Sequence, residues 1–231
     1  MQAWFESDVG RYVLAREQAW FDAVSADLFG FNALQLCGCG QDFLRANRMP
    51  YRFCAGLDQG QLHCLAEQLP LASQSLDLVV LPHVLEFSPD PHELLREVER
   101  TLRPEGRVLI AGFNPFSLWG VRRLFSSREA GWPWQARFIH LARLKDWLAL
   151  LGFDLVGGRM ACYAPPIDRR RCLERFAFLE AAGDRWWALG GGVYLLHGVK
   201  RVRGMRLIEP RWDKGWTARP SLAHTPRKSA Q

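Results

Sequence analysis

The alternation of apolar and polar positions changes its period along the chain, and each period predicts a different element. Within 9–28 the apolar residues fall mainly three and four positions apart, which indicates an amphipathic helix. Short apolar runs at 33–37, 51–55 and 76–84 predict strands. The last of them is apolar on both faces, as a central parallel strand requires. A further, weaker strand is expected within 61–68.

The next segment joins a helix to a strand at a length typical of a crossover. Leucine and valine lie on one side of a predicted helix at 92–102, which Asp90 is placed to cap. Pro104 and Gly106 end that helix, and an apolar strand follows at 107–113. A strand, a helix and a strand in this order predict a right-handed parallel unit.

The last third of the chain continues the alternation. Helices are predicted at 117–125, 141–151 and 168–189, and strands at 153–163 and 193–202. The final strand is expected to return antiparallel beside its predecessor. The sequence therefore predicts an α/β fold with a Rossmann-like doubly wound sheet, mostly parallel with an antiparallel last strand.

Size and composition favour one domain in the cytoplasm. The 231 residues, 48% apolar and 23% charged, have the usage of a globular protein and exclude a disordered or fibrous one. We expect a single domain over 1–208, with a core at about 31–202 and a flexible basic tail at 209–231. No run reaches the roughly 18 apolar residues of a membrane span, and residues 1–8 lack a signal-peptide pattern.

The net charge of +6 is concentrated toward the C-terminus. This basic third is expected either to attract an anionic partner such as RNA or to form a solvated face. The tryptophan pair Trp186 and Trp187 is expected in the core. The basic residues concerned are Arg169, Arg170, Arg171, Arg175, Lys200, Arg201, Arg203 and Arg206.

The cysteines are interpreted as reduced thiols. Most of the six lie in apolar stretches, where a free thiol behaves as a small hydrophobic group. One group of cysteine and histidine residues offers potential zinc ligands, but their spacing matches no usual ligand pattern, so no metal is predicted. That group is Cys37, Cys39, Cys54, His63 and Cys64.

Three consecutive motifs resemble those of one enzyme family. The stretch 69–80, LPLASQSLDLVV, is similar to a pattern in which "LPF" and "FDLV" introduce the fourth strand. The stretch 81–87, LPHVLEF, resembles "hhvLEH", and 102–110, LRPEGRVLI, resembles "LKPGGRLVI". The family is that of class I S-adenosylmethionine-dependent methyltransferases, in its broad type 11-like branch. The resemblance covers about 33–200 and is best within 69–114.

The resemblance implies a glycine-rich cofactor turn after the first strand, and this turn is altered here. The family pattern "vLDLGCGTG" corresponds to 34–40, LQLCGCG. Gln35 replaces the family's carboxylate if Cys37 takes the place of the first glycine, and Leu36 replaces it if Gly38 does. In both registers the acid that engages the cofactor's amino end is absent.

The resemblance also implies where S-adenosylmethionine would bind. Asp58 is the match for the acid that holds the ribose hydroxyls, and Leu65 occupies the position of the acid near the adenine, with Glu67 close by. The helix after the glycine turn, 42–47, is short. The predicted cofactor residues are Gln35, Gly38, Gly40, Asp58, Glu67, Leu69, Pro82 and His83.

His83 is the candidate catalytic residue, as a general base at the carboxyl end of the fourth strand, where Pro82 and His83 are expected to face the ligand crevice. The alternative is that this stretch only packs around the cofactor, with Glu86 capping or orienting the turn. The helix at 117–125 is interpreted either as an aromatic and basic lid over the acceptor or as a satellite apolar cluster.

The predicted function is methyl transfer to an unidentified small-molecule acceptor. The competing hypothesis is a methyltransferase-fold protein that has lost catalysis and acts as a binding or regulatory partner, motivated by the missing acids. A minority version of the enzyme hypothesis is an RNA methyltransferase that uses the basic C-terminal third.

Overall fold

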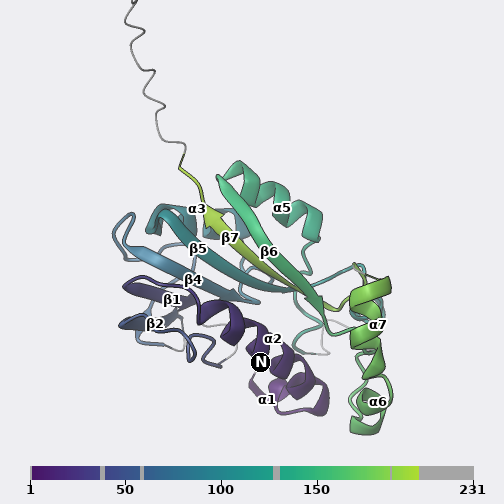
Figure 1. The fold of residues 1–231 in the computed structure, drawn as a ribbon. Coiled ribbons are helices and arrows are strands. Elements are labelled where there is room, and N and C mark those ends of the chain that lie inside the picture. The colour runs from purple at the N-terminus through teal and green to yellow at the C-terminus, as the bar shows by residue number, and fades with distance from the viewer. Residues whose placement is uncertain (1, 37–39, 58–59, 127–130, 188, 203–231) are drawn as a thin grey trace, which may run out of the picture.

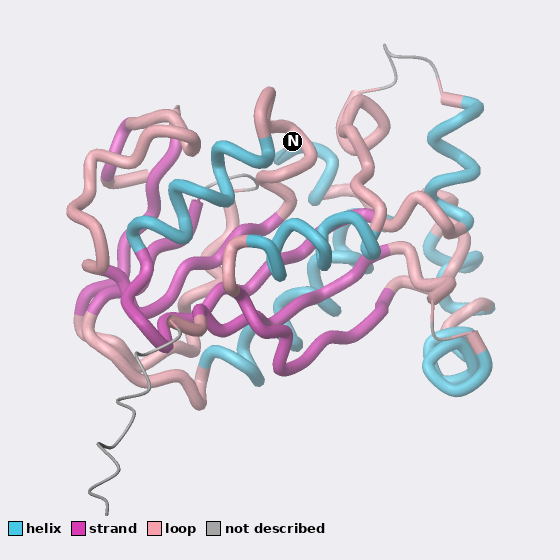
Figure 2. The backbone as a smooth tube through the Cα atoms, turned by 90° about the horizontal axis from the view of Figure 1, so that it is seen from above, coloured by secondary structure: helices cyan, strands magenta, loops and turns pink. Residues whose placement is uncertain are grey.

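The computed structural model describes residues 2–36, 40–57, 60–126, 131–187 and 189–202. Its strands form one twisted layer with helices on both sides (Figure 2). The sheet has the order β3-β2-β1-β4-β5-β7-β6, and β7 runs antiparallel to both of its neighbours. The predicted mostly parallel sheet with an antiparallel last strand is confirmed. The strands are β1 (Asn32–Leu36), β2 (Tyr51–Gly56), β3 (Leu62–His63), β4 (Leu76–Pro82), β5 (Leu102–Phe113), β6 (Phe153–Ala161) and β7 (Val193–Lys200).

Helices cover the two faces of the sheet and bury two apolar clusters. On β4, Leu78 and Val80 face one cluster, whereas Val79 and Leu81 face the other. Because both faces are buried, β4 is apolar except at Asp77, as expected of a central parallel strand. The helices are α1 (Gln2–Phe5), α2 (Asp8–Ser25), α3 (Pro91–Thr101), α4 (Leu118–Phe125), α5 (Leu141–Leu150), α6 (Arg170–Arg175) and α7 (Phe178–Trp186) (Figure 1).

Local capping explains why several boundaries were predictable. The Asp90 carboxylate accepts hydrogen bonds from the amides of His92 and Glu93 at 2.9 and 3.0 Å, and Pro91 occupies the first turn of α3. Ser7 caps α2 through its hydroxyl. These side chains satisfy amides that a helix leaves unpaired at its start.

Three local predictions were wrong. The segment 168–189 forms two helices, α6 and α7, instead of one. Residues 42–47 form turns and no helix. Trp186 and Trp187 are 83% and 69% exposed, so they are not in the core. A helical period identifies a shared face but does not say whether anything covers it.

Among the described residues, no helix combines the length and the apolarity that crossing a bilayer demands. The predicted tail, 209–231, lies outside the described residues.

Candidate functional site

The carboxyl ends of the parallel strands meet at one edge of the sheet, where ligands bind in open α/β folds. The pairing of β1 with β4, and of β4 with β5, places Leu36, Pro82 and Phe113 along this edge. The antiparallel strand β7 begins there, because Val193 pairs with Phe113. The edge therefore gathers the loops after β1, β4, β5 and β6.

Gln35 braces the turn that follows β1. Its side-chain amide donates to the carbonyl oxygen of Gln41 at 2.5 Å, and its Oε1 accepts from the amide of Phe43 at 2.8 Å. The residue is 1% exposed. An amide can donate and accept at once, whereas a carboxylate could not donate to the Gln41 carbonyl. Gln35, one of the two residues that could stand in place of the family's acid, therefore holds the turn through hydrogen bonds to the turn's own backbone.

The glycine turn is only partly described. Gly40 has a φ of +67°, a left-handed conformation that glycine adopts without strain. Gly38 and Asp58, two of the predicted cofactor residues, lie outside the described residues.

Glu67 and Leu69 lie against the β4 loop and α3. The Ser88 hydroxyl donates to the Glu67 carboxylate, which joins the β3 side to the loop after β4. The Leu69 amide donates to Glu97 at 2.9 Å, and Arg100 donates to the Leu69 carbonyl at 3.1 Å. The hydrogen bond from Arg100 is the main reason that the pKa of Glu97 is lowered. The LPL motif is thus held by an ion pair on α3.

His83 is wholly buried between two carboxylates. Its Nδ1 lies 2.9 Å from Glu86 Oε2, and its Nε2 lies 2.6 Å from Glu17 Oε1. The ring stacks on Phe113 with a centroid separation of 4.3 Å. His83 itself has a φ of +56°. We call Glu17, His83 and Glu86 the buried triad.

The two carboxylates set the protonation of His83. Burial by itself lowers the pKa of the imidazole, but Glu17 and Glu86 outweigh it and raise the pKa to about 10. Burial also raises the pKa of Glu86, against the hydrogen bonds that its carboxylate accepts. His83 is 0% exposed, contrary to the expectation that it faces the crevice. With both ring nitrogens engaged, its geometry suits holding the β4 loop better than accepting a proton.

The sequence interpretation missed Glu17, although a signal was present. On α2, Glu17 stands four residues after Val13 and four before Phe21, and all three are 0% exposed. A glutamate in the apolar stripe of a helix requires a buried partner. Only the fold shows that this partner is His83.

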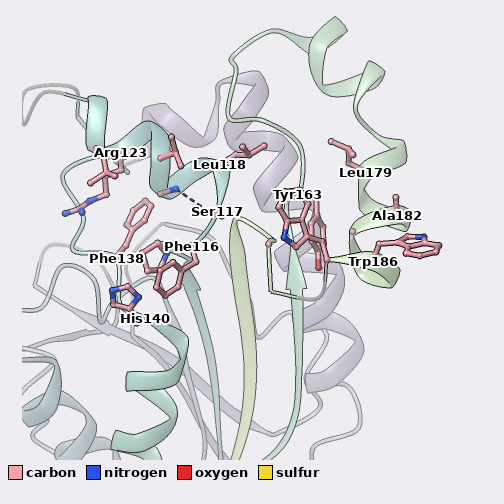
Figure 3. A pocket seen from close by; sticks show the side chains of 17 residues that line it. Phe116, Ser117, Leu118, Arg123, Phe138, His140, Tyr163, Leu179, Ala182 and Trp186 are labelled. Carbon is pink, nitrogen blue, oxygen red and sulfur yellow. Dashed lines mark hydrogen bonds between the residues drawn. The ribbon is translucent and has the colours of Figure 1, made fainter.

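A cavity of about 780 Å³ lies farther along the same edge of the sheet, between α4 with the residues just before it and α7. Figure 3 shows Phe116, Leu118 and Arg123 on one side, Ala182 and Trp186 on the other, and Tyr163 between them. Most of the lining is apolar. The Arg123 side chain is turned toward the protein, since its Nε donates to the carbonyl of Ala136 at 2.6 Å.

The α4 helix has features of both interpretations made from the sequence, the lid over the acceptor and the satellite apolar cluster. Trp119 is 0% exposed and donates from Nε1 to the Ala164 carbonyl at 3.1 Å, so the inner side of α4 belongs to the core. Its outer side contributes Leu118, Val121 and Leu124 to the cavity.

Residues 38–110 match the model of a family described as a methyltransferase domain. The matched region runs from the glycine turn through the buried triad's loop and into β5. Over these residues the chain is similar to methyltransferases, and its fold is that of class I methyltransferases.

The chain spans less than two thirds of the length of the curated relatives that it matches. The protein YafS of Escherichia coli is 42% identical over 88 residues, which are 38% of this chain and 37% of YafS. Rv2003c of Mycobacterium tuberculosis is 30% identical over 181 residues, 71% of this chain and 61% of that protein. A malonyl-[acyl-carrier protein] O-methyltransferase of Laribacter hongkongensis is 34% identical over 106 residues, 46% of this chain and 32% of the enzyme.

Solved structures share the fold at low sequence identity. A SAM-dependent methyltransferase from Archaeoglobus fulgidus superposes with a TM-score of 0.57 at 17% identity, over 82% of this chain and 94% of that one. The [4+2]-cyclase SpnF superposes with a TM-score of 0.56 at 19% identity, over 81% and 80% of the chains. Because the fold also carries a cyclase, it does not by itself identify the reaction.

Proposed function

We propose that this domain transfers a methyl group from S-adenosylmethionine to an acceptor that enters at the α4–α7 side of the sheet edge. The observation that carries the proposal is the family match over residues 38–110, which spans the cofactor side of this edge. The sheet order and the strands that end there support it.

The cofactor residues are those around the ends of β1 and β4. Gly38 and Gly40 would let the backbone approach the cofactor, and Asp58 would hold the ribose. Gln35 supports the turn instead of contacting the cofactor, because its side-chain amide already forms hydrogen bonds to the backbone of Gln41 and Phe43. Losing the family's charged hydrogen bond costs about 1.5 to 3 kcal/mol, or roughly one to two decades of affinity. Glu67, Leu69 and Pro82 complete the proposed site, and the buried His83 holds the β4 loop behind it.

The protein's task in this reaction is to position the acceptor. When bound, S-adenosylmethionine supplies an electrophilic methyl group on a good leaving group. The acceptor's lone pair forms the new bond to carbon as the carbon–sulfur bond breaks, and alignment supplies much of the acceleration. His83 acts here as a positioning residue, since it ties the β4 loop to α2 through Glu17. An acceptor that must lose a proton would find the His140 imidazole in the cavity lining.

The relatives support methyl transfer as the class of reaction, but they do not indicate which acceptor is methylated. The Laribacter hongkongensis relative is named for a malonyl group on a carrier protein, but the match covers 46% of this chain. We therefore take from it the methyltransferase reaction and leave its substrate aside.

Calorimetric titration with S-adenosylmethionine and S-adenosylhomocysteine tests the proposal. Binding is expected at micromolar to millimolar ligand, and Gly38→Val should abolish it. Gly157→Val is the matched control, because a Cβ at Gly157 meets nothing nearer than the His197 Cβ at 3.9 Å. Absence of heat at millimolar ligand would overturn the enzyme proposal and favour the inactive, regulatory alternative. Binding of RNA that weakens with salt would support the RNA version.

A further inference from the structure

The mouth of the α4–α7 cavity has an unusual concentration of exposed apolar side chains. Nearly half of the large apolar residues that are exposed among the described ones lie in the two short segments 116–125 and 178–189. Exposed apolar side chains gathered in this way are typical of a binding site. We call them the apolar rim: Phe116, Leu118, Val121, Leu124, Trp186 and Trp187 line the cavity, and Phe125, Phe178 and Leu189 belong to the same two segments.

The outward direction of the rim follows from firm packing on its inner side. A Cβ on Gly183 would come within 2.3 Å of the Tyr163 ring, so α7 lies directly against that side chain. The Glu180 carboxylate accepts from the Tyr163 amide at 2.9 Å and from the Tyr12 hydroxyl, which ties α7 to α2. With these contacts holding one side of α7, Trp186 and Trp187 remain exposed at its end.

Arginines flank the apolar rim. Arg122 lies on α4 between rim residues, and Arg185 lies beside Trp186; both are exposed. The adjoining helix α6 and its preceding residue add Arg169, Arg170, Arg171 and Arg175, all exposed. Figure 1 shows α6 and α7 stacked at the end of the sheet toward which β6 points. Of this group, Arg170 is paired with Glu174 at 2.8 Å.

We propose that this face docks on an anionic lipid surface and that the cavity behind it receives the acyl chain of a lipid acceptor. Tryptophan and phenylalanine between arginines are typical of segments that lie in the bilayer interface, where aromatic rings enter the headgroup region and arginine meets lipid phosphate. The cavity volume of about 780 Å³ is in the range of sites that enclose a drug-sized apolar molecule. The docking is inferred from the exposed apolar and arginine side chains alone, whereas the identity of the acceptor rests on the proposed methyltransferase function.

Vesicle sedimentation tests the docking. The full chain should bind vesicles of phosphatidylglycerol and phosphatidylcholine, should bind pure phosphatidylcholine about tenfold more weakly, and should lose affinity with added salt. Replacing Leu124→Glu together with Phe125→Glu should weaken binding about tenfold or more. Leu150→Glu on α5 is the matched control, because Leu150 is 85% exposed and Leu124 78%, and it should leave binding unchanged.

Two outcomes would overturn the docking. One is absence of vesicle binding at low salt. The other is equal loss of binding in the rim variant and in the Leu150→Glu control, which would show that binding does not depend on this face. A rim that pairs with a second copy of the chain would give a dimer in size-exclusion chromatography that Leu124→Glu dissociates, and it would likewise contradict the lipid proposal.

Quenching by brominated phospholipids tests the acyl-chain site. Trp186 and Trp187 line the cavity, so bromine on the acyl chains should quench part of the tryptophan fluorescence. The double variant Trp186→Phe and Trp187→Phe should lose most of that quenching when it is measured at a vesicle concentration that sediments all of the protein. Unchanged quenching would show that the chains do not reach the cavity.

These measurements separate the two proposals. S-adenosylmethionine binding without vesicle binding would leave the methyltransferase in place and remove the lipid surface. Vesicle binding without any cofactor binding would keep the docking face and remove the lipid acceptor along with the enzyme.

Discussion

The two halves of the sheet edge are built in opposite ways. At the ends of β1 and β4, polar side chains are buried and hydrogen-bonded: Gln35 to the backbone of its turn, and the side chains of the buried triad to one another. At the ends of β5 and β6, apolar side chains of the rim are exposed and Trp186 is 83% accessible. Burying charged groups and exposing apolar ones both cost stability. Each half therefore departs from the usual arrangement in the manner expected of a functional site.

We call the ends of β1 and β4 the cofactor half and the ends of β5 and β6 the acceptor half, after the function that we propose. The cofactor half gains rigidity from its buried hydrogen bonds. His83 connects α2 to the loop after β4, and the Phe113 amide donates to Glu86, which adds the end of β5. The buried triad thus joins α2, the loop after β4 and the end of β5. The acceptor half has a fixed inner side and a free outer side, which leaves its mouth open to a partner.

The largest effect is expected from breaking the buried triad. Glu86→Ala removes one carboxylate, leaves His83 with a single partner and leaves the Phe113 amide without its acceptor. Removing one partner from a buried charged network costs about 3 to 5 kcal/mol. Urea unfolding at pH 7 measures the loss. Glu174→Ala, whose side chain is 61% exposed, should change the free energy of unfolding by less than about 0.5 kcal/mol. Equal effects in both variants would contradict the triad's structural role.

Alkaline pH should weaken the same half. The pKa of His83 is about 10 in the folded protein and near 6.5 when unfolded, so its contribution is complete below about pH 6.5 and disappears as the pH rises through 10. We expect a loss of about 3 to 4 kcal/mol between pH 7 and pH 10. His83→Asn removes the titration and keeps a residue that tolerates a positive φ. If the free energy of unfolding varies with pH in the same way in the unmodified protein and in His83→Asn, the alkaline loss does not come from His83.

Displacing α7 tests the acceptor half. Gly183→Ala places a Cβ 2.3 Å from the buried Tyr163 ring. Overpacking of this kind costs about 1 to 3 kcal/mol, partly offset by alanine's better helix propensity. Thermal unfolding should show a lower Tm, whereas Gly157→Ala, with its nearest contact at 3.9 Å, should not. An unchanged Tm in Gly183→Ala would show that α7 packs more loosely than described.

The smallest effect is expected at the rim. Leu124→Ala should change the free energy of unfolding by less than about 0.5 kcal/mol, because Leu124 is 78% exposed. Leu144→Ala on α5, where the leucine is 0% exposed, should cost about 2 to 5 kcal/mol. Similar losses in both would mean that the rim is part of the core, and the contrast between the two halves would disappear.

Much of the fold was predictable where the signals were local. The run from β4 through α3 to β5 follows from an apolar strand, a capping Asp90 and a helix that ends before the next strand. The helix at 168–189 was not predictable as two pieces, because α6 and α7 have no side-chain cap to mark their starts. The sequence predicted that the candidate site lies at the carboxyl ends of the strands. It did not predict the structural roles of Gln35 and His83 there.

The sequence by itself determined the succession of strands and helices along the chain, the apolar faces and the family resemblance, because these depend on residues close together in the chain. Only the tertiary structure decided that Glu17 meets His83, 66 positions away, and that Gln35 bonds within its own turn. It likewise decided that the tryptophans of α7 lie uncovered at the mouth of a cavity. Periodicity tells which residues share a face, whereas the identity of what lies against that face depends on how distant segments pack.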